Sequence, residues 1–69
     1  MTADVFHRRI PKGDWELCYI KSGTKKEIIK SAEGLLRSLR EDEGFPRAKV
    51  EIRFESGRKI SIKYKAKNA

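Results

Sequence analysis

The segment from Thr24 to Gly44 constrains the fold of this chain most, because no other segment has an apolar pattern long enough for one convincing helix. Its apolar residues recur at the spacing of a single helix face: Ile28, Ala32, Leu35, Leu36 and Leu39. Thr24 and Glu27 have the spacing of a capping box, and Gly44 followed by Pro46 predicts the end of the helix. Gly34, inside this helix, costs about 1 kcal/mol relative to alanine, which predicts close approach to a strand or to a partner.

The segment after the helix alternates with a period of two residues, which is typical of strands with one buried face. A three-residue connection from Glu55 to Gly57 places Ile52 opposite Ile60, whereas a two-residue turn would place Phe54 opposite Lys59 and mix the two faces. The sequence therefore predicts a hairpin with a three-residue loop. Its predicted inward pairs are Ile52 with Ile60, Val50 with Ile62, and Ala48 with Tyr64.

Residues 5–10 and 15–20 predict a second hairpin, joined by a loop that contains Pro11 and Gly13. In the second of these strands both faces have apolar character, so the pattern leaves its inward face open. Trp15, Leu17 and Tyr19 alternate onto one face, and Glu16, Cys18 and Ile20 onto the other. Aromatic strand residues are more often core residues, although Trp15 and Tyr19 would provide stacking if their face is open.

These elements together predict an α+β fold of the order ββ-α-ββ, in which one helix packs on a mostly antiparallel sheet in a small two-layer domain. The first strand is the least well defined of the five elements. Residues 1–69 are too few for more than one domain with a thin core, and we expect residues 1–4 and 66–69 to be flexible.

Catalysis and metal binding have few candidate residues in this chain. Cys18 and His7 are the only candidates for a nucleophile and its base, and the three-residue loop would place His7 on the surface, opposite Leu17 and away from Cys18. We expect Cys18 to be a half-buried structural residue. One histidine and one cysteine cannot supply the ligands of a zinc site. The sequence therefore predicts a protein that is not an enzyme and has no cofactor and no metal.

The net charge of +7 is concentrated at one end of the chain. Residues 47–69 hold eight basic and two acidic residues, a net charge of +6, whereas the helical segment 24–46 is neutral. In the predicted register Arg53 lies opposite Lys59, and Lys49 lies opposite Lys63. Like charges on opposite strands are destabilising, so this face is a candidate for binding a polyanion. The candidate nucleic-acid-binding residues are Lys49, Arg53, Arg58, Lys59, Lys63 and Lys65.

A weaker candidate for anion contact lies at the start of the helix, where backbone N–H groups are free to bind phosphate. Its residues are Thr24, Lys25 and Lys26. The glycine-rich pattern of a P-loop is absent from the sequence, so helix capping is the simpler interpretation of this segment.

The leading hypothesis is a small regulatory protein that binds nucleic acid through phosphate contacts made by its basic C-terminal hairpin. The alternative is a protein–protein inhibitor or adaptor, of the kind that a phage or mobile element encodes, which docks on an acidic partner surface. Contacts through Trp15, Tyr19 or Gly34 would favour that alternative. The single cysteine and the lack of a signal-peptide or membrane-spanning pattern predict a cytoplasmic protein without membrane contact. Homodimerisation through an exposed strand edge is a further expectation.

Overall fold

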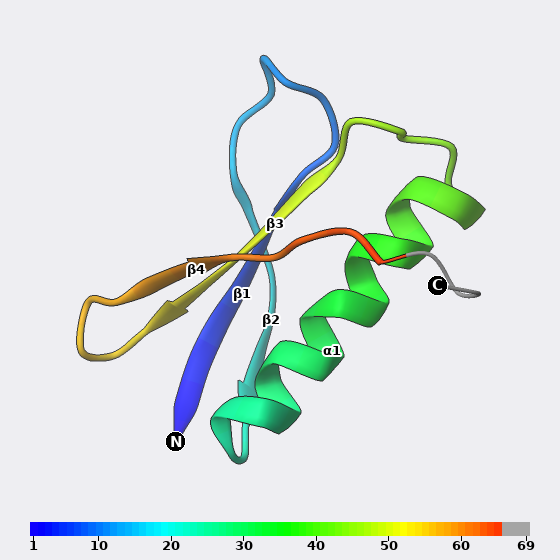
Figure 1. The fold of residues 1–69 in the computed structure, drawn as a ribbon. Helices are drawn as coiled ribbons and strands as arrows, with labels where there is room; N and C mark the ends of the chain where they lie inside the picture. The colour runs from blue at the N-terminus through cyan, green and yellow to red at the C-terminus, as the bar shows by residue number, and fades with distance from the viewer. Residues whose placement is uncertain (66–69) are drawn as a thin grey trace.

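A computed structural model, which describes residues 1–65, shows one helix packed across one face of a four-stranded antiparallel sheet (Figure 1). This arrangement confirms the predicted α+β fold. The strands are β1 (Thr2–Arg8), β2 (Glu16–Ser22), β3 (Lys49–Phe54) and β4 (Lys59–Ser61), and their order in the sheet is β2-β1-β3-β4. The helix α1 (Lys25–Arg37) continues into a wider π-helical turn, η1 (Ser38–Asp42).

The helix begins and ends at the residues that the sequence predicts. The backbone N–H of Glu27 donates to the Thr24 hydroxyl, and the backbone N–H of Thr24 donates to the Glu27 carboxylate, each over 3.1 Å. Gly44 has a φ of +79°, and Phe45 N–H donates over 3.0 Å to the carbonyl of Leu39 behind it. Only a left-handed residue lets the chain turn back in this way. Within residues 1–65, no helix is both long enough and apolar enough to cross a membrane.

The core lies between α1 and the two central strands, β1 and β3. Ile28 and Leu36 of α1 and Ile52 of β3 are at most 1% exposed. Buried residues alternate along β1 and β3, which places one side of each strand against the helix. Within residues 1–65 the buried apolar residues are Ala3, Val5, Ile28, Ala32, Leu36, Leu39, Ala48, Val50 and Ile52. Leu35, predicted on the same stripe, is only partly buried against this core.

The N-terminal segment differs most from expectation, because β1 is a central strand. We expect residues 1–4 to be flexible, but Thr2, Ala3 and Asp4 belong to β1. Thr2 pairs with β2, and Ala3 and Asp4 pair with both β2 and β3. Ala3 and Val5 are buried under the helix. The remaining terminal expectation, for residues 66–69, lies outside the described residues.

Three further expectations about the first hairpin are wrong because its second strand contains a β-bulge. The register shifts between Val5, which pairs with Tyr19, and Phe6, which pairs with Leu17, so that Cys18 is the extra residue. Cys18 is exposed rather than half-buried. His7 consequently lies opposite Glu16 instead of Leu17, and it is buried at 6% exposure rather than on the surface.

The same bulge separates side chains that simple alternation would place on one face. Tyr19 lies on the helix side, where its hydroxyl is 2.7 Å from that of Ser31 in α1. Leu17, paired with Phe6, lies on the opposite side of the sheet and is 54% exposed. Alternation fails here because the extra residue reverses the side on which each following side chain lies.

The second hairpin has the predicted loop and register, but its last strand is short. Ile52 pairs with Ile60, and Ile62 N–H donates to the Val50 carbonyl over 3.0 Å. The predicted pair of Ala48 with Tyr64 is wrong. Tyr64 lies instead at the C-terminal end of the helical segment, where its hydroxyl donates to Glu41. The strand ends at Ser61, so the strand pairing does not reach Lys63 either.

Gly34 has no packing role within the described residues. A Cβ atom at this position would meet no other atom within 4 Å, so the expected close approach of a strand is absent. Within this fold the glycine therefore brings only its conformational cost.

Replacing Gly34 with alanine should raise the free energy of unfolding by about 1 kcal/mol, because alanine loses less backbone entropy in a helix. The same replacement at Gly44 should lower it by roughly 1 to 2 kcal/mol, because the φ of +79° is strained for alanine. Urea unfolding of the two variants beside the parent chain measures both changes. Equal effects at the two glycines would contradict this assignment.

Candidate nucleic-acid interface

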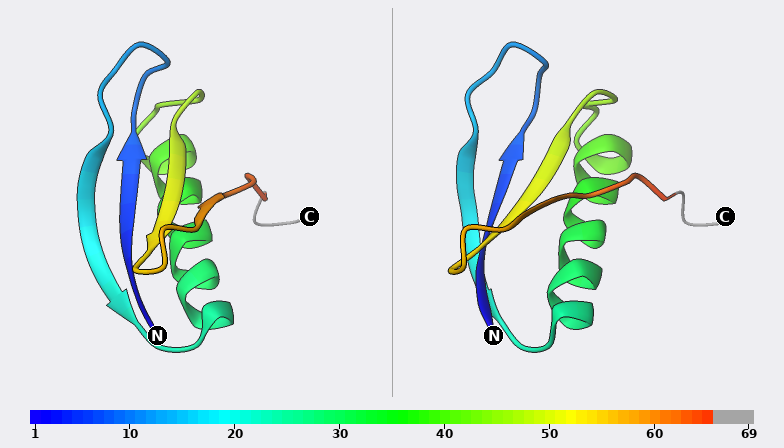
Figure 2. Two further views of the ribbon diagram at one scale, coloured as in Figure 1. Left: turned by 90° about the vertical axis from the view of Figure 1, so that its left-hand side faces the viewer. Right: turned by 60° about the vertical axis from the view of Figure 1, so that its left-hand side comes forward.

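One face of the sheet is left open, because the single helix covers only the other. In the left panel of Figure 2 this open face is turned toward the viewer, with α1 behind it. Strand alternation decides which side chains lie there, since their neighbours in β1 and β3 are buried against the helix. The open-face residues are Thr2, Asp4, Phe6 and Arg8 of β1, Leu17, Ile20 and Ser22 of β2, Lys49, Glu51 and Arg53 of β3, and Lys59 and Ser61 of β4.

Basic side chains occupy neighbouring positions across three strands of the open face. Lys49 lies opposite Arg8, and Arg53 lies opposite Lys59, so each pair brings two positive charges together. Two carboxylates share the face. Glu51 lies 2.6 Å from Arg53, and Asp4 is the partner of Arg53 in β1. The four basic side chains outnumber the two acids, so the face as a whole is positive.

Two of these arginines lie over aromatic rings. The guanidinium carbon of Arg53 is 4.0 Å from the centre of the Phe6 ring, and that of Arg8 is 4.9 Å from the centre of the Trp15 ring. Stacking holds the planar guanidinium against the sheet and leaves N–H groups at its edge for an oxyanion. The buried Nε of Arg8 has no hydrogen-bond partner among the described residues.

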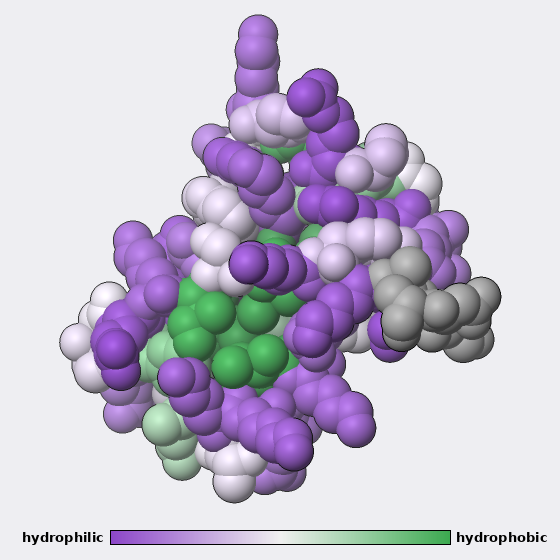
Figure 3. All heavy atoms as spheres, viewed as in Figure 1, coloured by the Kyte–Doolittle hydropathy of each residue, from purple (hydrophilic) through white to green (hydrophobic). Residues whose placement is uncertain are grey.

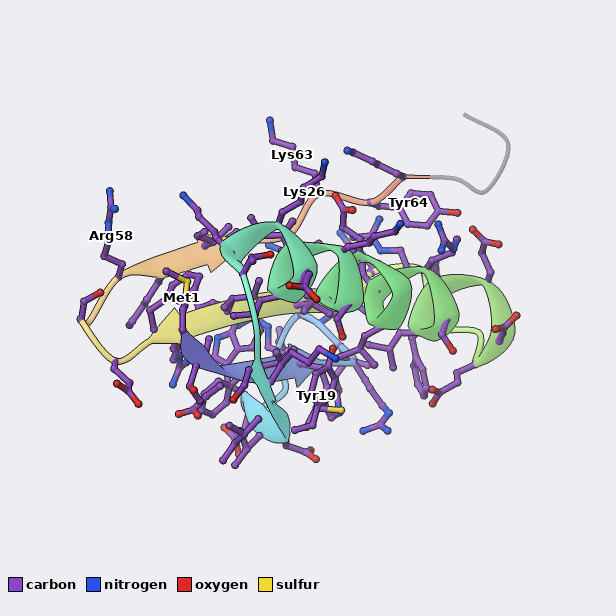
Figure 4. All side chains as sticks on the ribbon, turned by 90° about the horizontal axis from the view of Figure 1, so that it is seen from below. Met1, Tyr19, Lys26, Arg58, Lys63 and Tyr64 are labelled. Carbon is purple, nitrogen blue, oxygen red and sulfur yellow. The ribbon has the colours of Figure 1, made fainter. Side chains whose placement is uncertain are left out.

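The six residues predicted from the sequence do not form one surface. Lys49, Arg53 and Lys59 lie on the open face. Arg58 instead lines a hollow beside Lys25 at the start of α1. Lys65 lies 3.4 Å from Glu33 on α1, and Lys63 projects at the same edge as Lys26 (Figure 4).

Sequence reasoning missed Phe6 and Arg8, although both are central to this face. The signal that identifies them is the alternation of Ala3 and Val5 with the residues between them. This alternation identifies a sheet face only when β1 is known to be a strand that pairs on both sides. The sequence offers Trp15 as a stacking residue, and Arg8 already lies over its ring.

At the start of α1, the capping box uses two of the N–H groups that an anion would need. These are the N–H groups of Thr24 and Glu27. The pKa of Glu27 lies below its ordinary value of 4.5, mainly because the Thr24 backbone donates a hydrogen bond to its carboxylate. The hydrogen bond with the Thr24 side chain is the second cause. A negative charge therefore already occupies this helix end, beside the exposed Lys25 and Lys26.

Residues 1–65 contain no group of three or more side chains placed to hold a metal ion. His7 is buried, and its Nε2 is 2.8 Å from Arg9 Nη1, which donates to it. Cys18 lies at the exposed bulge in β2.

Comparison of this chain with models of known families, with curated proteins and with solved structures gave no match.

Replacing Glu27 with glutamine should lower stability at neutral pH and have less effect in acid. A carboxylate whose pKa is lowered by folding stabilises the fold above its ordinary pKa of 4.5, and this contribution is lost as the pH falls through the lowered value. Urea unfolding midpoints of both proteins, measured from pH 7 down to pH 3, should converge in that window. A difference that is constant with pH would contradict this role of Glu27.

Proposed function

We propose that this protein is a small, non-enzymatic regulatory protein that binds nucleic acid through phosphate contacts on the open face of its sheet. The observation that carries the proposal is the pair of arginines stacked on aromatic rings, each opposite a lysine of a neighbouring strand. A stable fold gains little from like charges placed opposite one another, whereas a phosphate backbone neutralises both partners of each pair.

The composition of the face favours phosphates over bases as the groups contacted. Its aromatic rings are covered by guanidinium groups, so bases have no bare ring on which to stack. Lys49 and Arg53 are four residues apart in β3, which is about 13 Å along a strand. This spacing is long enough for the two side chains to contact separate phosphates of one strand.

A cytoplasmic location belongs to the same proposal. The exposed, unpaired thiol of Cys18 suits a reducing compartment. DNA and RNA offer the same phosphate chemistry to this face, so binding has to be measured with both.

A protein partner is the second candidate function, and one observation favours it. Apolar side chains at the edge between α1 and β4 are only partly covered, and phosphate contacts do not need an apolar surface of this kind. Trp15 and Tyr19 do not supply that surface, since Trp15 stacks under Arg8 and Tyr19 is hydrogen-bonded to Ser31.

The paired replacement Lys49→Glu and Lys59→Glu should weaken nucleic-acid binding at least tenfold, because it puts two negative charges among the cations that meet the phosphates. Fluorescence anisotropy with labelled duplex DNA, single-stranded DNA and RNA measures the dissociation constants. The matched control is Lys26→Glu with Lys30→Glu, which changes the net charge equally on α1 and should change affinity less than threefold.

Salt provides a second readout of the same experiment. If four cations meet four phosphates, the slope of log affinity against log salt should be about −3 for single strands and about −3.6 for duplex DNA. Absence of binding at low salt, a slope near zero, or equal losses in the two paired variants would contradict the proposal.

A further inference from the structure

An apolar hollow lies at the edge of the molecule where β4 and the first half of α1 do not meet. Figure 3 shows it as a hydrophobic patch between these elements, surrounded by hydrophilic side chains. One part has a volume of about 520 Å³, and its apolar lining comes from Met1, Phe54 and Ile60. A second part, of about 580 Å³, is lined by α1 residues alone around Ile29, and Lys25 borders both parts.

The hollow follows from how the helix and the last strand are placed. Ile28 is fully buried against the central strands, so its neighbour Ile29 lies at the β4 side of the helix and is only half-buried. Beyond Ser61 the chain leaves the sheet and crosses to α1, where Lys65 lies 3.4 Å from Glu33. Ile60 and Ile29 thus border the hollow with no further element of the described chain to cover them.

The rim of the hollow is strongly basic. Its charged residues are Lys25, Lys26, Lys30, Arg58 and Lys59 against Glu33 and Glu55. Glu33 is also engaged by Lys65, which reduces the negative charge it offers. Arg58, Lys26 and Lys63 project from this edge in Figure 4. An apolar floor with a basic rim complements a ligand that combines apolar groups with carboxylates.

The edge of β4 adds a backbone template to this surface. Phe54 N–H donates to the Arg58 carbonyl over 2.9 Å, and Ile62 N–H donates to the Val50 carbonyl over 3.0 Å. In an antiparallel ladder, hydrogen-bonded and non-bonded pairs alternate. The backbone groups of Lys59 and Ser61 therefore point away from β3, at an edge that has no partner strand in the described chain.

We infer that this hollow binds an extended acidic segment of a partner protein, which adds to the sheet as a fifth strand beside β4. Apolar side chains on the helix side of the segment cover Ile29 and Ile60 beside Lys25, and carboxylates on its other side lie against Lys59. This interaction goes beyond the proposed nucleic-acid binding and uses a neighbouring surface that shares only Thr2 and Lys59 with the open face.

Two other occupants fit the surface less well. Nucleic acid matches the basic rim but leaves the apolar floor uncovered. A second copy of this chain would bring another basic edge to the first, and the net charge of +7 opposes that contact. An acidic segment with alternating apolar residues satisfies the rim, the floor and the strand edge together.

The test uses the whole protein and a fluorescein-labelled octapeptide of alternating valine and glutamate, followed by fluorescence anisotropy. We expect saturable binding that weakens at least tenfold with the paired replacement Lys25→Glu and Lys30→Glu. The matched control Lys12→Glu with Lys49→Glu, which changes the net charge equally at exposed residues outside the hollow, should change the affinity less than twofold. Circular dichroism of each variant verifies that it remains folded.

Two further peptides separate charge from strand pairing. Alternating valine and lysine should not bind, and a peptide with proline at its central positions should bind at least tenfold more weakly, since proline cannot donate to a ladder. In ¹⁵N-labelled protein, the octapeptide should shift the amide signals of Lys59 and Ser61.

Four results would overturn the inference. They are absence of saturable binding, equal binding of the lysine peptide, amide shifts confined to β1 and β3, and displacement of the peptide by single-stranded DNA whose own binding is lost with Lys25→Glu and Lys30→Glu. The last result would assign the hollow to nucleic acid.

Discussion

The packing of one helix against one side of the sheet determines most of the molecule. Ile28, Leu36 and Ile52 meet in the middle of this layer and are almost entirely removed from water. Burying each such side chain contributes about 1.5 to 3 kcal/mol, so these contacts outweigh any single surface interaction. A single helix cannot cover both faces of a four-stranded sheet. The open face and the uncovered edge beside β4 are therefore consequences of the same packing.

Local signals in the sequence predict the parts of the fold that depend on nearby residues. The capping box at Thr24, the helix stop at Gly44 and the loop that pairs Ile52 with Ile60 are all confirmed. The central position of β1 could not be predicted in this way, because it depends on pairing with β3, which is distant in the sequence. The buried His7 further weakened the apolar signal of that strand.

The candidate site likewise has one part that local sequence signals predict and one part that depends on tertiary contacts. Strand alternation places Lys49, Arg53 and Lys59 on one face without knowledge of the tertiary structure. The stacking of Arg53 on Phe6 joins two strands from opposite ends of the chain, and no local pattern contains it. The alternating pattern of the hairpin continues past Ser61 and therefore predicts Lys65 as part of it. In the structure the chain leaves the sheet after Ser61, and Lys65 lies beside Glu33 of α1.

The central position of β1 has a consequence for synthesis of the chain. During translation β1 can pair with β2 early, because only a short loop separates them. Its other side remains unpaired until residues 49–54 leave the ribosome, since β3 is its only other partner in the sheet. The nascent chain therefore passes through a stage with a helix and a two-stranded hairpin but no closed core, in which Val5 is exposed and β1 is open to wrong pairing.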